Sequence, residues 1–312
     1  MTPHDLASPG ARFTVVIVLH DSEPELRTLL RSIETHLPDP PQLVVVDSGS
    51  RDGGPDVAAE HGAEVVALAG NPGFGAANNA GIELARHDVT VLLNPDCELL
   101  DASLVVLAAI ARRHPDALHV PRLLNPDGTV QRSVHPLPGT PGTLLPALVH
   151  PPLLPRGLRE RAEPHRADGA RTVGWAIAAC LAASTATLRR LGPFDPSVHL
   201  FAEDLKLALR ARAEGIPTVL HPGLRLRHTG GHATLRAGEP YDVLARRRRE
   251  AIAGTLGRTA LAVDDLAQAL TFATRAAGHA VLGGDAARPR AQLAALRRAR
   301  WGQPHRRSPG PP

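Results

Sequence analysis

The chain has 312 residues, 43% of them hydrophobic, which is enough for one large α/β domain or two smaller ones. Its formal net charge is +4, but Lys206 is its only lysine, and the frequent arginine, alanine, glycine and proline are typical of a GC-rich coding bias. The overall basicity is therefore discounted, and we expect no nucleic-acid partner. Two isolated cysteines, Cys97 and Cys180, argue against a thiolate metal centre and a disulfide framework.

Residues 1–12 hold acidic and turn residues rather than the basic start and apolar core of a signal peptide, so no signal peptide is expected. We expect this segment to be a flexible N-terminus. No apolar run reaches the roughly 18 residues that a membrane span needs. We therefore expect a cytoplasmic protein, either free or attached peripherally to the inner face of the cell membrane.

Apolar, valine-rich runs alternate with helical patterns along the first hundred residues. Residues 23–36 repeat leucine and isoleucine on one helical face, and shorter helical patterns separate the later runs. This alternation predicts an α/β fold with a Rossmann-like, mostly parallel sheet flanked by helices. The runs predict strands buried on both faces, as in a parallel sheet, at 13–20, 42–47, 63–68 and 89–94.

The pattern changes after Arg122. Residues 135–156 are rich in proline and are expected to form a mobile loop without regular structure. An apolar segment and a helix follow in 173–192, and a further strand runs into a histidine-bearing loop in 217–233. These boundaries predict one domain that covers residues 13–235.

The C-terminal part of the chain is arginine-rich and helical in pattern. We expect a helical region at 236–299 and a disordered tail at 300–312. Four consecutive arginines, Arg246–Arg249, precede an apolar segment at 261–282 that charged residues interrupt. Two interpretations are open: the region lies on an anionic membrane surface, or the helices pack on the sheet and the arginines are solvated.

Polar side chains follow three of the predicted strands. They are His20-Asp21-Ser22, then Asp47 with a serine- and glycine-rich turn, and then Asn94-Pro95-Asp96. Ligands bind beyond the carboxyl ends of the strands in open parallel sheets. Three such clusters on one rim therefore predict a binding crevice.

Each candidate site residue also has an ordinary structural interpretation. Asp47 could close an Asx turn or accept the imide N–H of a uracil or thymine base. Asp96 could end a strand in a turn, or bind a divalent cation that also holds a diphosphate. The Gly/Asn segment 71–81 could cap a helix or admit a ligand, and it lacks the spacing of a dinucleotide fingerprint. Glu203-Asp204 could be a helix cap or half of an active site.

These pieces, in this order, resemble the inverting family 2 glycosyltransferases of the GT-A fold, and among them the bacterial rhamnosyltransferase-type enzymes that build cell-wall or surface polysaccharide. The resemblance implies a GT-A domain that moves a sugar from a dTDP- or UDP-linked donor, dTDP-rhamnose among them, to a hydroxyl of a glycan or lipid-linked acceptor. It covers most of residues 13–232 and is carried by VVIVLHDS, LVVVDSGSRDG, NPGFGAANNAGI, LLNPDCEL and LRRLGPFDPSVHLFAEDLKLALRARAEGIPTVLHPGLRLRHTGG.

The resemblance also implies a role for each matched residue. Asp204 would be the catalytic base with Glu203 beside it, and a helix N-terminus, which stabilises a carboxylate by about 0.3–1 kcal/mol, would keep the base ionised. Asp96 and His228 would bind Mg²⁺ or Mn²⁺, which offsets the charge of the leaving diphosphate. The nucleotide sugar would lie against His20, Asp21, Ser22, Asp47, Asn71, Gly73, Phe74, Gly75, Asn79, Asn94 and Trp175.

Two other functions remain as alternatives. A sugar-1-phosphate nucleotidyltransferase binds nucleotide on a similar sheet, but its Gly-rich, Arg/Lys-bearing loop after the first strand is missing here. A non-catalytic glycosyltransferase-like protein that binds a nucleotide sugar is the second. Departures from the family pattern favour it: His20-Asp21 stands where Tyr-Asn is common, and Lys206 holds a position that is usually acidic or polar.

Overall fold

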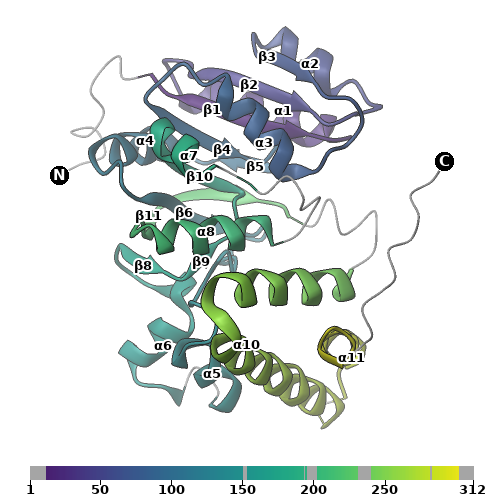
Figure 1. The fold of residues 1–312 in the computed structure, drawn as a ribbon. Helices are drawn as coiled ribbons and strands as arrows, with labels where there is room; N and C mark the ends of the chain where they lie inside the picture. The colour runs from purple at the N-terminus through teal and green to yellow at the C-terminus, as the bar shows by residue number, and fades with distance from the viewer. Residues whose placement is uncertain are drawn as a thin grey trace.

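The computed structural model describes residues 12–149, 153–192, 194, 202–230, 240–281 and 283–301. Figure 1 shows a central sheet with helices on both faces and a group of helices below one end of it. The expected N-terminal flexible segment lies outside the described residues except for Arg12, and so does the expected tail beyond Trp301.

The first four strands of the chain's main sheet form the predicted parallel unit, in the order β3-β2-β1-β4. All residues of β1 except Val18 are fully shielded from solvent, and they alternate between the two apolar cores on either side of the sheet. In register, Leu19 lies beside Asp47, so β1 and β2 end at the same level of the rim. The bounds are β1 (Thr14–Leu19), β2 (Gln42–Asp47), β3 (Glu64–Ala67) and β4 (Val89–Leu93).

The other half of the sheet is mixed, so the parallel order that the sequence predicts extends only across the first four strands. β10 runs antiparallel to both β4 and β6, and β11 is parallel to β6 but antiparallel to β5 and β8. Because β10 runs opposite to β4, its first residue, Cys180, lies beside Leu93 at the end of β4. The segment that leads into β10 therefore lies at the edge of the sheet where β1 and β4 end, which is called the rim below. The bounds are β5 (Cys97–Leu99), β6 (Leu118–Leu124), β8 (Arg171–Val173), β10 (Cys180–Ser184) and β11 (Thr218–His228).

Helices cover both faces of the sheet, as predicted. One face packs against α1 (Glu23–His36), α2 (Gly54–Glu60) and α4 (Ser103–Arg113), whose apolar stripes join the same core as Val15 and Ile17. The other face packs against α3 (Phe74–Glu83), α7 (Thr185–Leu191) and α8 (Glu203–Ala213), which share a core with Val16.

The expectation that residues 135–156 lack regular structure is wrong for much of the segment. β7 (Val134–His135) pairs with β9 (Trp175–Ala176), and α5 (Pro141–Leu148) packs against α10. Pro141 occupies the first turn of α5, where the missing N–H would have no helical partner in any case. A second short helix, α6 (Arg156–Ala162), starts at the end of the segment.

The C-terminal helical region is present as α10 (Tyr241–Val281) and α11 (Ala287–Trp301). α10 is two arms, because Gly257 has φ 82° and ψ 178°, which are not helical, and the chain turns back there (Figure 1). Across the turn, Arg248 binds Asp264 through two hydrogen bonds of 2.9 and 2.8 Å. Arg249 pairs with Asp265 through a single contact to Oδ2, so the two arms are joined by ion pairs with two buried aspartates.

Candidate active site

The turns after β1 and β2 are tied to each other by hydrogen bonds. The backbone N–H of Asp21, which has a positive φ of 48°, donates to Ser50 Oγ at 3.0 Å. His20 Nδ1 lies 3.0 Å from the carbonyl oxygen of Ser48, and Ser22 Oγ donates to the carbonyl of His20 at 2.9 Å. The two predicted polar clusters therefore form one continuous rim.

Asp47 is a buried carboxylate at the end of β2. Its Oδ1 accepts the backbone N–H of Ser50 at 2.9 Å, which is the turn that the sequence left as one of two interpretations. Its other oxygen accepts no hydrogen bond from the residues that the structure describes. One oxygen thus fixes the turn, and the second remains for another donor.

The loop before α3 approaches this rim closely. A Cβ atom on Gly49 would lie only 3.2 Å from the carbonyl group of Gly70, so a side chain there would push the two loops apart. Asn71 Oδ1 accepts the N–H of Gly73, which has a φ of 100° at the start of the helix. Glycine is the residue that adopts this conformation without strain.

Asn79 has a structural contact that its predicted role did not include. Its amide both donates to the carbonyl and accepts from the N–H of Phe194, each at 2.9 Å. The ring of Phe74, on the first turn of α3, meets that of Phe194 edge to face at 6.0 Å. Phe74 and Asn79 therefore hold Phe194, which follows α7, against α3. Gly75, also on the first turn of α3, is buried.

Asp96 and His228 lie together although they are far apart in the chain. β5 pairs with β11 so that His228 stands beside Cys97, and His228 Nε2 is 3.3 Å from Asp96 Oδ1. Asp96 Oδ2 also accepts the N–H of Gly230 at 3.0 Å. Burial raises the pKa of Asp96, but the hydrogen bond and charge of His228 outweigh it and hold the pKa below its usual value.

Gln131 is a member of this site that sequence reasoning missed. Its Oε1 lies 2.8 Å from His228 Nδ1, and its Nε2 donates to the carbonyl of His228 and to Asn125 Oδ1, each at 3.2 Å. Because an amide oxygen cannot donate, Nδ1 of His228 carries a proton and donates it to Gln131, while Nε2 faces Asp96. No motif marks Gln131, because it lies in an irregular segment and is 97 residues from His228 in sequence.

The donor atoms of this cluster fit a magnesium or manganese ion. Oxygen from Asp96 and imidazole nitrogen from His228 suit such cations, and a diphosphate and water can supply the other ligands. Cys97 Sγ also lies within 4.8 Å of both groups, but it donates to the carbonyl of Ala179 at 3.3 Å, and burial raises the pKa of the thiol well above its usual value. Cys97 is therefore a packing residue, and Asn94 supplies only a neutral amide nearby.

Glu203 and Asp204 begin α8, after Ala202 with a positive φ of 68°. Burial, followed by the charge of Asp204, raises the pKa of Glu203 to about 8. Burial also raises the pKa of Asp204 to about 6, although the backbone of Leu205 and Ala178 donates hydrogen bonds to it. Burial therefore opposes the ionisation that the helix N-terminus favours at the base, and Asp204 keeps the lower pKa of the two carboxyl groups.

The segment after β9 joins the two halves of the site. Asp204 contacts the backbone of Ala178, whereas the N–H of Asn94 donates to the carbonyl of Ala179 at 2.9 Å and Cys97 Sγ donates to the same oxygen. The carboxylate pair thus contacts Ala178, and the residues on either side of Asp96 contact Ala179, the next residue in the chain. A hydroxyl near Asp204 and a phosphate near Asp96 would be neighbours.

A cavity of about 330 Å³ opens beside the carboxylate pair, between the sheet and α10. Trp175 forms one wall: its ring stacks on His135 at 4.2 Å, and Arg248 lies 6.0 Å from its centre. Within the described residues, Trp175 Nε1 and Glu203 Oε2 have no hydrogen-bond partner. Unsatisfied buried polar atoms of this kind are typical of sites that bind a polar ligand.

A mixed sheet with a polar rim, an acidic strand end at Asp96 and a carboxylate pair at the start of α8 is the architecture of the GT-A glycosyltransferases. Residues 14–172 match the family model Glycosyl transferase family 2, which is about half of the chain, so the protein belongs to that family. The predicted fold and enzyme class are confirmed.

Known relatives agree with this assignment. The chain is 29% identical over 250 residues, 74% of its own length and 80% of the relative's, to an N-acetylglucosaminyl-diphospho-decaprenol L-rhamnosyltransferase of Mycobacterium tuberculosis. It is 27% identical over 208 residues, 65% of its length and 62% of the relative's, to the low-salt glycan biosynthesis hexosyltransferase Agl10 of Haloferax volcanii. Among solved structures, the mannosyltransferase PcManGT of Pyrobaculum calidifontis, in complex with GDP-Man and Mn²⁺, has the same fold with a TM-score of 0.57 at 16% identity, over 94% of this chain and 88% of that one.

Proposed function

We propose that this glycosyltransferase moves a sugar from a nucleoside-diphosphate sugar to a hydroxyl of a lipid-linked glycan acceptor, with inversion at the anomeric carbon. The observation that carries the proposal is the junction at Ala178-Ala179, where Asp204 contacts the first residue and the Asp96 strand end contacts the second. An acceptor hydroxyl and a leaving diphosphate need such neighbouring sites.

The donor side of the reaction rests on Asp96, His228 and the β1–β2 rim. A divalent cation held by Asp96 and His228 supplies charge neutralisation for the departing diphosphate. The free oxygen of Asp47 accepts the imide N–H of uracil or thymine, which supports a UDP- or dTDP-linked donor. The Mycobacterium tuberculosis relative is named as a rhamnosyltransferase, and this favours dTDP-rhamnose.

The acceptor side rests on the protonation of the carboxylate pair. Asp204 is the ionised member and removes the proton from the acceptor hydroxyl as that hydroxyl attacks the sugar, an effect worth about 10²–10⁴-fold. Glu203 stays protonated, so it adds no second negative charge beside the departing diphosphate. A single displacement inverts the anomeric carbon and needs no covalent nucleophile.

A lipid-linked acceptor brings the protein to a membrane surface. None of the described helices is both long enough and apolar enough to cross a membrane. The Arg246–Arg249 patch supports attachment less than its sequence suggests, because Arg248 and Arg249 are paired with buried aspartates and Arg247 lies 3.3 Å from Glu250. We place the enzyme on the inner face of the cell membrane through its acceptor rather than through this patch.

A panel of nucleotide sugars tests the proposal directly. The full-length enzyme is incubated with UDP-, dTDP- and GDP-sugars in Mg²⁺ or Mn²⁺, and released nucleoside diphosphate is measured with and without a polyprenyl-diphosphate-linked sugar. Metal-dependent release with one donor, and an inverted linkage in the product by NMR, is the expected result. Binding without any turnover would favour the non-catalytic alternative, and pyrophosphate release from a nucleoside triphosphate and a sugar 1-phosphate would favour the nucleotidyltransferase.

A further inference from the structure

A second, larger cavity lies between α5 and α6 on one side and α10 and α11 on the other. Its volume is about 1380 Å³, larger than the roughly 300–1,000 Å³ of common small-molecule sites. It adjoins the smaller cavity, because Trp175, Arg248 and Phe272 line both. A ligand that extends through the large cavity can therefore reach the carboxylate pair.

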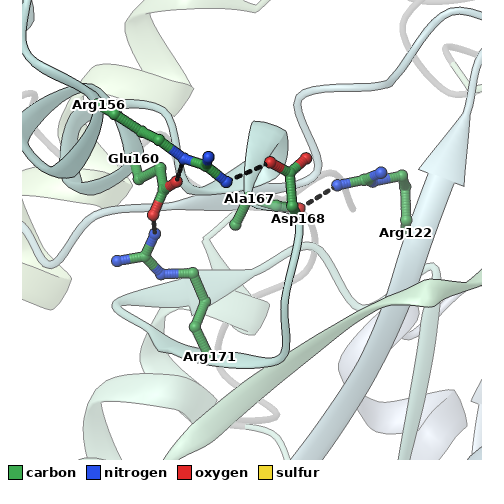
Figure 2. Close-up of polar contacts among 6 residues, drawn as sticks. All are labelled: Arg122, Arg156, Glu160, Ala167, Asp168 and Arg171. Carbon is green, nitrogen blue, oxygen red and sulfur yellow. Dashed lines mark hydrogen bonds and ion pairs between the residues drawn. The ribbon is translucent and has the colours of Figure 1, made fainter.

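The lining of this cavity is strongly cationic. Seven arginines and three carboxylates contribute to it. The three carboxylates are already occupied: Glu160 and Asp168 bind Arg156 at 2.9 and 2.7 Å (Figure 2), and Glu163 lies 3.3 Å from Arg166. Each acidic side chain of the lining thus makes an ion pair with an arginine, and Glu163 acts on Arg132 only through its charge.

Three of the arginines have no counter-ion among the residues that the structure describes. Arg132, Arg159 and Arg275 line the cavity and make no ion pair or side-chain hydrogen bond with those residues. Arg132 lies before β7, Arg159 lies on α6, and Arg275 lies on the second arm of α10, so separate elements bring them to the same cavity. Like charges converge in this way where an anionic ligand balances them.

The ionisation of neighbouring groups reflects the same positive field. Burial, followed by the charges of Arg132 and Arg248, lowers the pKa of His135 well below its usual value. Burial and then Arg132 lower the pKa of His165 to about 4. Both imidazoles are neutral at physiological pH, so they add no charge and can donate hydrogen bonds. His165 Nδ1 is buried and has no hydrogen-bond partner in the part of the chain that the structure describes.

The cavity also has an apolar edge. Leu148 and Val149, at the end of α5, line it and are 63% and 37% exposed. Leu153 and Leu158 follow in the chain and are 77% and 41% exposed. A ligand with an anionic head and a hydrocarbon chain would satisfy both the free arginines and these leucines.

We infer that the cavity binds the diphosphate and first isoprene units of a polyprenyl-diphosphate-linked acceptor. The inference rests on the proposed function and identifies where in the molecule the acceptor binds. Arg132, Arg159 and Arg275 bind the phosphate oxygens. The isoprene chain of the ligand leaves the cavity past Leu148 and Val149. The attached sugar extends past Trp175, and its hydroxyl meets Asp204.

Binding of farnesyl diphosphate tests the inference without a sugar transfer. The full-length protein is titrated by calorimetry in EDTA, which prevents metal-dependent diphosphate binding at Asp96. Inorganic pyrophosphate and farnesol are titrated in parallel to separate the contributions of the charged head and of the chain. We expect farnesyl diphosphate to bind more tightly than pyrophosphate, and farnesol to bind weakly.

Four variants locate the site. Arg132→Gln and Arg275→Gln should each weaken farnesyl diphosphate binding at least about tenfold, since each removes a charge-assisted contact to phosphate. Arg132→Lys keeps the charge and should retain most of the affinity, which separates loss of charge from loss of folding. Arg113→Gln, at the exposed end of α4, removes one arginine outside both cavities and should change nothing.

A fluorescence measurement reports on the position of the ligand. The chain has two tryptophans, Trp175 in the cavity wall and the exposed Trp301. In a Trp301→Phe background, farnesyl diphosphate should change the emission of Trp175. Equal affinity of wild type and Arg132→Gln, no binding of farnesyl diphosphate, or binding no tighter than that of pyrophosphate would overturn the inference.

The outcomes distinguish this inference from the proposed function. A protein that hydrolyses a nucleotide sugar but does not bind farnesyl diphosphate is a glycosyltransferase with another acceptor, so the inference alone fails. A protein that binds farnesyl diphosphate through Arg132 but turns over no donor keeps the site and loses the proposed activity.

Discussion

Gln131 contacts His228 at two points, accepting from the imidazole Nδ1 at 2.8 Å and donating to the backbone carbonyl at 3.2 Å. One side chain therefore fixes both the ring and the strand end that carries it. Such outer contacts set the tautomer and direction of a metal-binding histidine and commonly contribute 10- to 100-fold in metal affinity. The contact leaves Nε2 of His228 facing Asp96.

Gln131→Leu should weaken Mn²⁺ binding in the presence of UDP or dTDP by about 10- to 100-fold, because His228 loses its orienting acceptor. Gln131→Glu keeps an acceptor oxygen for the imidazole but loses the donor to the carbonyl of His228, so its affinity should lie between that of wild type and that of the leucine variant. Mn²⁺ binding followed by electron paramagnetic resonance measures both without turnover. Unchanged affinity in the leucine variant would mean that β11 alone orients His228.

Asp96→Asn should abolish metal-dependent nucleotide binding, because a neutral amide replaces the carboxylate that faces His228. Calorimetry with UDP or dTDP, with and without Mn²⁺, measures the change. EDTA should remove the activity of the wild-type enzyme, and added Mg²⁺ or Mn²⁺ should restore it. Full activity in EDTA would show instead that protein cations stabilise the leaving group.

Asp204→Asn should lower turnover at least about a hundredfold and leave donor binding unchanged, because it keeps the shape of the side chain and removes its ability to accept a proton. Glu203→Gln reproduces the protonated form of its residue and should keep most of the activity. Steady-state rates on a chosen donor and acceptor compare the two variants. An active Asp204→Asn with an inactive Glu203→Gln would reverse the two roles.

The pH dependence should report the pKa of Asp204. A base must be ionised, so turnover should fall as the pH drops through about 6, the pKa to which burial raises Asp204. Glu203 is already protonated in that range, so Glu203→Gln should leave this acid limb in place. Turnover of the wild-type enzyme and of Glu203→Gln, measured from about pH 5 to about pH 9, tests this dependence. A wild-type turnover that falls as the pH drops through about 8 would point to Glu203 as the base.

Asp264→Asn should destabilise the fold by on the order of 3 kcal/mol, because it leaves the Arg248 guanidinium partly buried without its counter-ion. Asp88→Asn is the matched control: Asp88 also binds an arginine, Arg112, through two hydrogen bonds but is 60% exposed. That change should cost under about 1 kcal/mol. Urea unfolding of the two variants measures the difference, and equal losses would show that burial of the α10 pair adds nothing.

Sequence reasoning located the parallel strands because each is an uninterrupted apolar run, and such runs are recognisable without knowledge of their partners. It singled out Asp96 and the Glu203-Asp204 pair as candidates because each lies at the end of an element, in an order that resembles a known family. It missed Gln131, because only the pairing of β5 with β11 brings His228 to it. That pairing joins segments far apart in the chain.

Other differences have equally local causes. The proline content of 135–156 concealed α5, where Pro141 occupies a position that needs no N–H. The pKa order of Glu203 and Asp204 depends on burial, which a helix-cap pattern does not report. The sequence leaves the four arginines from Arg246 either on a membrane surface or solvated, because the acidic partners of Arg248 and Arg249 lie 16 residues away. These residues meet only because the chain reverses at Gly257.

The reversal at Gly257 has a consequence for how this enzyme can diversify. The match to the family model ends at residue 172, within β8, whereas both arms of α10 and all of α11 are encoded after it. Genetic exchange of this terminal hairpin between relatives would alter one wall of the larger cavity and leave the β1–β2 rim intact. Under the proposed function, the acceptor preference would then change in one recombination event, and the donor preference would be inherited separately.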